Sequence, residues 1–119
     1  MKKKIIVSDD NEDLLYLMVT ILQNGGYDVL GLRDGRVIME GLYDQPDLFI
    51  LDNEMEPYDG IAITKYIKSK PGGHSVPVMM ISGSAGADEA AAAAGIDLLL
   101  TKPVNSALLL LSVRKLIPV

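Results

Sequence analysis

Leu48-Phe49-Ile50-Leu51-Asp52 is a run of four apolar residues that ends in a carboxylate. A strand with one face in water alternates apolar and polar residues, whereas an unbroken apolar run is typical of a strand covered on both faces, as in a parallel sheet. Four other short runs share this unbroken character, namely residues 5–7, 29–30, 78–81 and 98–100. The pattern predicts a buried parallel sheet of five strands.

Segments of helical length separate these runs. In residues 11–24 the side chains of Leu14, Met18 and Leu22 fall on one stripe, and two glycines follow as stop signals. Residues 37–43, 61–69, 87–94 and 107–116 fill the other intervals. The alternation predicts an α/β fold, a flavodoxin-like doubly wound (βα)5 sandwich whose parallel sheet has the strand order 2-1-3-4-5.

Size and composition limit the class of protein. A chain of 119 residues and 12.8 kDa fits a single domain over residues 1–119. The absence of cysteine excludes disulfides and thiolate metal sites. Sixteen acidic residues against 11 basic ones give a net charge of −5, which argues against direct nucleic-acid contact. Because no apolar run approaches the ~20 residues of a membrane span or forms a signal-peptide core, we expect a cytoplasmic protein without membrane contact.

Polar side chains stand where the predicted strands end. Asp9 and Asp10 follow the first strand, Asp52 the third, Ser82 the fourth and Lys102 the fifth. In open parallel sheets, ligands bind outside the carboxyl ends of the strands, where the strand order reverses. The first and third strands flank that point in the expected order. We therefore expect the three aspartates to meet in one crevice, with the serine and the lysine reaching in from the next two strands.

The residue types at this crevice suit phosphoryl chemistry. Neighbouring carboxylates raise one another's pKa unless a cation relieves them, and oxygen ligands favour Mg²⁺ or Mn²⁺. Lys102 can pair with Asp52, and the Ser82 hydroxyl and the Gly83 amide can donate hydrogen bonds to phosphoryl oxygens. An aspartate can be the nucleophile that forms an acyl phosphate. We interpret the cluster as a site of phosphoryl transfer to Asp52.

Four motifs, each at a strand end, are together similar to those of one family. They are residues 5–12 with the acidic pair, residues 52–60 from aspartate to glycine, residues 81–83, and residues 101–104 with Lys102-Pro103. Over essentially its whole length the chain resembles the receiver domain of two-component response regulators, of the chemotaxis-regulator kind. The resemblance implies a phospho-acceptor switch rather than a turnover enzyme. It also implies a phosphohistidine donor on a sensor histidine kinase or a histidine phosphotransfer protein, and a downstream protein that the sequence does not name.

The resemblance further implies a metal site and a phosphoryl site. The expected Mg²⁺ ligands are Asp10 directly, Asp9 mainly through water, Asp52, and Glu54 through its backbone carbonyl. The expected phosphoryl-binding groups are Ser82, Lys102 and the backbone of Gly83 and Glu54. Phosphorylation is expected to change the surface of the fourth helix, fifth strand and fifth helix, and the Lys102–Pro103 peptide bond is expected to be cis.

Four positions depart from the family pattern. Glu56 takes the place of a proline, which comes one residue later as Pro57. Glu54 puts an acidic side chain beside the metal, where it could either order the metal or repel an incoming phosphate. Leu99 stands three residues before the lysine, where the family often has an aromatic residue that reports phosphorylation. Ser82 replaces the more common threonine and keeps the hydroxyl.

Three functional interpretations follow. The first is a phospho-acceptor switch with no output domain in this chain, which is either a protein in its own right or a piece of a longer regulator. The second is a receiver-like protein-interaction module that works without phosphorylation. The third is a Mg²⁺-dependent phosphatase, for which Glu54 has the spacing of a second carboxylate but no cap domain is present. His74 is expected to be a solvated loop residue rather than a phosphodonor.

Overall fold

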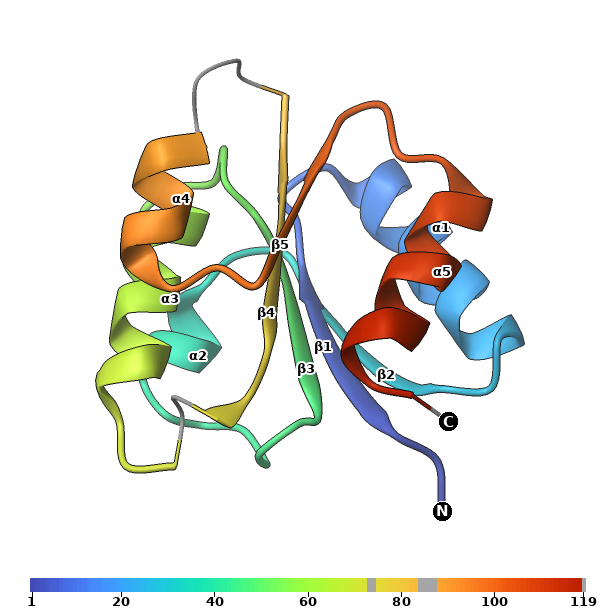
Figure 1. The fold of residues 1–119 in the computed structure, drawn as a ribbon, viewed down its shortest axis with the longest axis horizontal. Coiled ribbons are helices and arrows are strands. Elements are labelled where there is room, and N and C mark those ends of the chain that lie inside the picture. Colours follow the sequence, from blue (N-terminus) through green and yellow to red (C-terminus); the bar gives the residue numbers. More distant parts are fainter. Residues whose placement is uncertain (73–74, 84–87, 119) are drawn as a thin grey trace.

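The sheet has five parallel strands in the order β2-β1-β3-β4-β5 (Figure 1). The strands are β1 (Lys4–Ser8), β2 (Asp28–Leu32), β3 (Leu48–Asp52), β4 (Val78–Ser82) and β5 (Leu98–Thr101). The computed structural model describes residues 1–72, 75–83 and 88–118. His74 and Ala87, the expected start of the fourth helix, lie outside these ranges. The predicted α/β class and strand order are confirmed.

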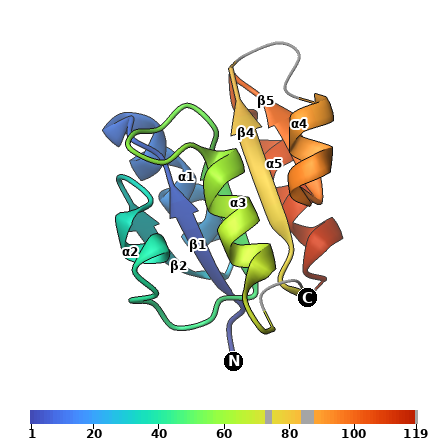
Figure 2. The same ribbon diagram turned by 90° about the vertical axis from the view of Figure 1, so that its left-hand side faces the viewer.

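Helices cover both faces of the sheet. In the described ranges they are α1 (Glu12–Asn24), α2 (Arg36–Met39), α3 (Gly60–Ser69), α4 (Asp88–Ala94) and α5 (Ser106–Leu116). One face carries α1 and α5, and the other carries α2, α3 and α4 (Figures 1 and 2). Within the described residues, no helix combines the length and the apolar character needed to cross a bilayer.

The central strand β3 shows why its apolar run is unbroken. All five of its residues are buried. Leu48 and Ile50 pack in the core between the sheet and helices α1 and α5, whereas Phe49 and Leu51 pack in the core on the α2 and α3 side. Because successive side chains of a strand point to opposite faces, a strand with helices on both sides needs an apolar residue at every position.

Among the helix starts that the structure describes, those of α1, α3 and α5 have side-chain caps. The side chains of Asn11, Asp59 and Asn105 accept hydrogen bonds from backbone amides in the first turns of α1, α3 and α5. Because Asn11 caps α1, the carboxylates of Asp9 and Asp10 are not used for that purpose.

The predicted extent of the second helix, residues 37–43, is wrong. The helix begins at Arg36 and ends at Met39. It ends early because Gly41 has a φ of +72°, the left-handed conformation that terminates helices.

The parallel register brings the carboxyl ends of the strands to one level. Ser8 pairs with Leu51, so the acidic pair after β1 lies beside the end of β3. At the other side of β3, Asp52 pairs with Ile81, and Ser82 in turn pairs with Thr101. The predicted site residues therefore emerge from one edge of the sheet. Among the described residues, the expected Lys102–Pro103 peptide bond is cis, and so is Glu56–Pro57.

Gly60 allows the first turn of α3 to lie against the end of β3. A Cβ atom at this position would lie 2.9 Å from the backbone oxygen of Asp52 and 3.0 Å from Cα of Asn53. Real side chains do not make such contacts with backbone, so one of the two segments would have to move. This close approach accounts for a glycine at this distance from the aspartate.

We expect Gly60→Ala to lower the free energy of unfolding by about 1–3 kcal/mol, the usual cost of overpacking. Helix propensity alone would act in the opposite direction, by up to about 1 kcal/mol. Urea denaturation shows whether the substitution lowers or raises the free energy of unfolding. Ser106→Ala, at the exposed first position of α5, is the control and should change stability by less than about 0.5 kcal/mol. A stabilised Gly60→Ala variant would show that the close approach does not constrain the fold.

Candidate functional site

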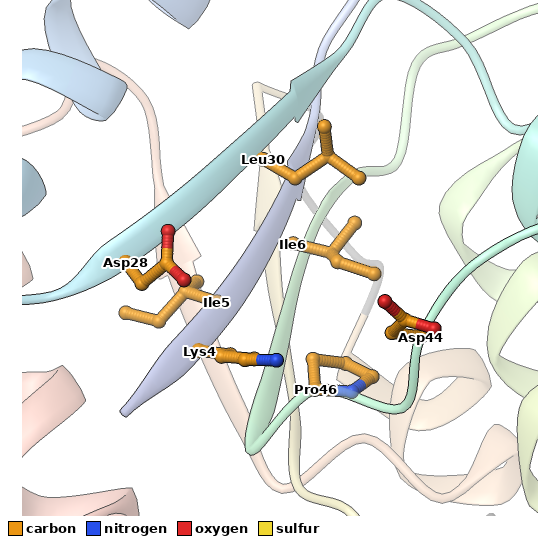
Figure 3. Close-up of a pocket in the computed structure, with 7 residues that line it drawn as sticks. All are labelled: Lys4, Ile5, Ile6, Asp28, Leu30, Asp44 and Pro46. Carbon is orange, nitrogen blue, oxygen red and sulfur yellow. The ribbon is translucent and has the colours of Figure 1, made fainter. Parts of the chain in front are cut away.

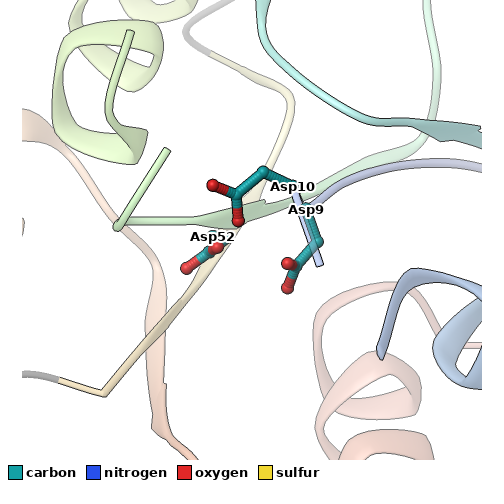
Figure 4. Close-up of side chains that lie close together, drawn as sticks. All are labelled: Asp9, Asp10 and Asp52. Carbon is teal, nitrogen blue, oxygen red and sulfur yellow. The ribbon is translucent and has the colours of Figure 1, made fainter. Parts of the chain in front are cut away.

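Three carboxylates meet where β1 and β3 end (Figure 4). Asp9 and Asp52 are buried, and Asp10 is exposed at the surface of the cluster. One carboxylate oxygen from each of the three residues lies within 4.8 Å of the others. The three aspartates expected to meet are therefore brought together, with Asp9 and Asp52 buried and Asp10 facing solvent.

The hydrogen bonds of the two buried carboxylates leave one oxygen of each unsatisfied. The backbone amide of Asn11 donates to Asp9 Oδ1 at 2.9 Å, and the amide of Glu54 donates to Asp52 Oδ1 at 3.1 Å. Asp9 Oδ2 and Asp52 Oδ2 are buried and have no hydrogen-bond partner among the described residues. Buried polar atoms of this kind need an explanation such as a water or an ion. An all-oxygen set with two such atoms fits a hard divalent cation such as Mg²⁺ or Mn²⁺.

The side chain of Lys102 faces this cluster. Lys102 Nζ lies 3.1 Å from Asp52 Oδ1, and the Asp52 side chain is fully buried. Burial by itself lowers the pKa of the Lys102 ammonium, but the hydrogen bond and charge of Asp52, with the charges of Asp9 and Glu54, raise it above its ordinary value. The lysine therefore stays charged, and several nearby acidic groups share one positive charge.

The pKa of Asp9 reflects this crowding of acidic groups. Burial is the main cause that raises it from 3.8 to about 6, and the charge of Asp52 acts in the same direction, against the opposing effects of the Asn11 amide and of Lys102. Without a cation the ionised form of this carboxylate is disfavoured, so the binding of a cation would stabilise that form.

The two predicted hydrogen-bond donors at the end of β4 are already engaged. The buried Ser82 hydroxyl donates to Oε2 of Glu54 at 2.8 Å, and the Gly83 amide donates to Oε1 at 2.6 Å. The Glu54 carboxylate thus reaches across from the loop after β3 to the end of β4. A Cβ atom at Gly83 would lie 3.3 Å from Oε1, so the glycine leaves room for this contact.

Leu99, at the position where the family often has an aromatic residue, is half-buried in β5. It lines a hollow of about 510 Å³ between α4, β5 and α5, together with Ala91, Ala92 and Leu108. This is the surface expected to change on phosphorylation, and its floor is aliphatic.

A second hollow lies away from the carboxylates. It has a volume of about 170 Å³ and lies beside β1 and β2, where Lys4, Asp28 and Asp44 surround Ile6 and Leu30 (Figure 3). None of the predicted site residues lines it. The chemistry that the sequence predicts is therefore concentrated at the carboxyl edge.

The geometry agrees with the comparison with known families. The family model of the response regulator receiver domain matches residues 5–114. The chain belongs to this family. It is thus a receiver domain of the two-component signalling type.

Curated relatives of this receiver domain include a transcriptional regulatory protein and a response regulator. The alkaline phosphatase synthesis transcriptional regulatory protein PhoP of Bacillus subtilis is 32% identical over 83 residues, which are 69% of this chain and 34% of PhoP. The polar-differentiation response regulator DivK of Brucella anthropi is 24% identical over 108 residues, which are 88% of each protein. The receiver domain therefore spans about a third of PhoP and most of DivK.

Solved structures share its fold. The chemotaxis response regulator CheY4 of Vibrio cholerae superposes with a TM-score of 0.91 at 22% identity, over 98% of this chain and 100% of CheY4. The receiver domain of the sensor histidine kinase PA1611 of Pseudomonas aeruginosa, solved with magnesium in its active-site cleft, gives a TM-score of 0.90 at 23% identity over 100% of both chains. At these identities the likeness establishes the fold of the receiver domain.

The contacts of two residues in this receiver domain were not foreseen. The sequence placed the Glu54 side chain beside the metal, whereas its carboxylate contacts Ser82 and Gly83. Ser8 ends β1, and its hydroxyl contacts the sulfur of Met55 at 3.2 Å, which links the loop after β3 to the first strand. Residue spacing carries no signal for either contact, because both depend on how the loop after β3 folds back.

We expect Asp9→Asn to alter the pH dependence of stability in the metal-free receiver domain. Since the folded pKa of about 6 exceeds the ordinary 3.8, the folded state holds this proton more tightly, and the stability it contributes is lost as pH rises from about 4 to about 6. Removing the group should leave the variant more stable by about 1 kcal/mol at pH 7.5. Urea unfolding in EDTA at a series of pH values measures the difference, with exposed Asp13→Asn as the control. If the free energies of unfolding of Asp9→Asn and wild type change with pH in parallel, the raised pKa of Asp9 is contradicted.

Proposed function

We propose that this receiver domain is a phospho-acceptor switch in which Asp52 takes a phosphoryl group from a phosphohistidine. The observation that carries the proposal is the environment of Asp52. It is a buried carboxylate whose Oδ1 is held by Lys102 at 3.1 Å and whose Oδ2 has no partner among the described residues, beside two further aspartates. Further positive charge would stabilise this buried anion, and its oxygen without a partner can form the bond to phosphorus.

The proposed transfer exchanges one bond to phosphorus for another. The N–P bond of the phosphohistidine breaks, an O–P bond to the Asp52 carboxylate forms, and the departing imidazole takes up a proton. Mg²⁺, when bound, supplies positive charge to the phosphoryl oxygens. Asp9, Asp10, Asp52 and the backbone carbonyl of Glu54 are its proposed ligands.

The remaining residues orient the transferred group. Lys102 presents a fixed ammonium beside Asp52, and the Ser82 hydroxyl and the amides of Gly83 and Glu54 supply hydrogen-bond donors for the equatorial oxygens. These groups come from three different strand ends, so the phosphoryl group is bound by several segments at once. We assign the domain to residues 1–119 and its output to the surface of α4, β5 and α5, which includes Leu99.

The proposed partners follow from this chemistry. A phosphohistidine donor requires a sensor histidine kinase or a histidine phosphotransfer protein. Among the similar structures, the PA1611 receiver domain belongs to a sensor histidine kinase, which supports that pairing. The downstream partner is a protein that reads the α4, β5 and α5 surface. We propose a cytoplasmic location and no direct contact with nucleic acid or membrane, in keeping with the net charge of −5.

The other two interpretations have less support. A phosphorylation-independent module has no need for a buried aspartate paired with a lysine, and such a pair is costly to maintain without a function. A turnover phosphatase needs to enclose a small substrate, and Glu54 is already bound to the end of β4. Phosphoryl acceptance and loss at Asp52, rather than catalytic turnover, is the function that we propose.

We expect acetyl phosphate with Mg²⁺ to add one phosphoryl group to the protein, and Asp52→Asn to abolish the addition because the nucleophile is lost. Intact-mass measurement at short reaction times follows the modification. Asp44→Asn is the matched control, since Asp44 is exposed and distant from the carboxylate cluster. Equal mass gain in Asp52→Asn and wild type would exclude Asp52 as the acceptor.

We also expect Mg²⁺ to raise the melting temperature of the unphosphorylated protein, because it relieves the repulsion among the three aspartates. Asp10→Asn should weaken Mg²⁺ binding by about tenfold or more, corresponding to about 1.4 kcal/mol. Asp13→Asn, an exposed aspartate in the first turn of α1, should bind as wild type does. Titration calorimetry with EDTA-treated protein gives the affinities, and equal affinities in all three proteins would rule out the proposed metal site.

A further inference from the structure

Glu54 is an acidic residue with both of its carboxylate oxygens bound inside the site. Oε1 accepts from the Gly83 amide at 2.6 Å, and Oε2 accepts from the Ser82 hydroxyl at 2.8 Å. The bond from the Gly83 amide is short for an N–H···O bond, as expected when the acceptor is charged, and the bond from the Ser82 hydroxyl has the usual length of an O–H···O bond. The residue itself is exposed, yet its head group is fixed by two donors from a different strand end.

These donors are the ones that the proposed function gives to the phosphoryl oxygens. A hydroxyl has one hydrogen to donate and a backbone amide has one, so each can serve one strong acceptor at a time. A carboxylate carries a negative charge shared by two oxygens, and in this it resembles two of the three phosphoryl oxygens. In the unmodified protein the Glu54 carboxylate therefore stands where a phosphoryl group would have to bind.

The backbone of the same residue is fixed to the phosphoacceptor. The Glu54 amide donates to Oδ1 of Asp52 at 3.1 Å, so the side chain starts next to the acceptor and reaches across to β4. A Cβ atom at Gly83 would lie 3.3 Å from Oε1 of Glu54, so a larger residue there would crowd the glutamate carboxylate, whereas its 3.7 Å distance from Cδ of Lys102 is an ordinary contact. The glutamate thus links the ends of β3 and β4 without any ligand.

We propose that Glu54 lowers the affinity of the phosphoryl site by occupying the Ser82 and Gly83 donors until an incoming phosphoryl group displaces it. This inference rests on the proposed function. It carries two consequences. Phosphoryl groups and their mimics bind less tightly than the donors alone would allow, and the end of β4 is already held toward the site in the unmodified protein.

The first test compares the binding of a phosphoryl mimic. We expect Glu54→Ala to bind beryllofluoride about tenfold more tightly than wild type in the presence of Mg²⁺, since the competing acceptor is gone. Glu54→Gln, which keeps the size and loses the charge, should fall between the two. Glu56→Ala is the matched control, because it removes an equal charge from the same loop at an exposed position and should stay within about twofold of wild type. Equal gains in Glu54→Ala and Glu56→Ala would assign the effect to net charge and overturn the proposal.

The second test uses the unmodified protein without a donor or mimic. Loss of a short bond to a carboxylate should move the Gly83 amide proton upfield and speed its exchange with solvent in Glu54→Ala, with no change in Glu56→Ala. An unchanged Gly83 amide would overturn the inference even if Asp52 is phosphorylated normally. Conversely, failure of Asp52 to accept a phosphoryl group would remove the proposed function, while the Gly83 amide would still report whether Glu54 occupies the donors.

Discussion

The carboxylate of Asp52 ends a strand in which every residue is buried, and a charge in such a place has to be compensated. Its compensation is the ammonium of Lys102, which follows the last strand of the sheet and lies 3.1 Å away. The pair exists only because the strand order places β3 and β5 on either side of β4, with all carboxyl ends at one level. The charge of Asp52 can therefore be compensated by Lys102 only in a sheet with this strand order.

One lysine does not neutralise its surroundings. Asp9, Asp10 and Asp52 converge within a few ångströms, and Glu54 lies close enough to affect the pKa of Lys102. The excess of negative charge has two different outcomes in the fold. At the ends of β1 and β3 it leaves buried oxygens without partners among the described residues, which suits a divalent cation. At the end of β4 the negative charge of Glu54 is stabilised by hydrogen bonds from the Gly83 amide and the Ser82 hydroxyl.

Much of this arrangement could be predicted from the sequence, because it depends on periodicity and topology. Unbroken apolar runs indicate strands covered on both faces, and their order fixes which strand ends are neighbours; this placed Asp9, Asp52 and Lys102 together. The extent of α2 could not be predicted, since it depends on the left-handed backbone at Gly41. Nor could the direction of the Glu54 side chain, because a loop that folds back has no period from which to read its contacts.

The strand that precedes Lys102 lies at the edge of the sheet and has a neighbour on one side only. Edge strands detach from folded proteins more readily than central ones, in local opening events that leave the rest of the molecule intact. When β5 detaches, it carries the lysine away from Asp52 and leaves a buried carboxylate without its counter-charge. Any anion bound to both Lys102 and the end of β4 therefore opposes this opening, and its binding free energy is added to the cost of peeling the edge away.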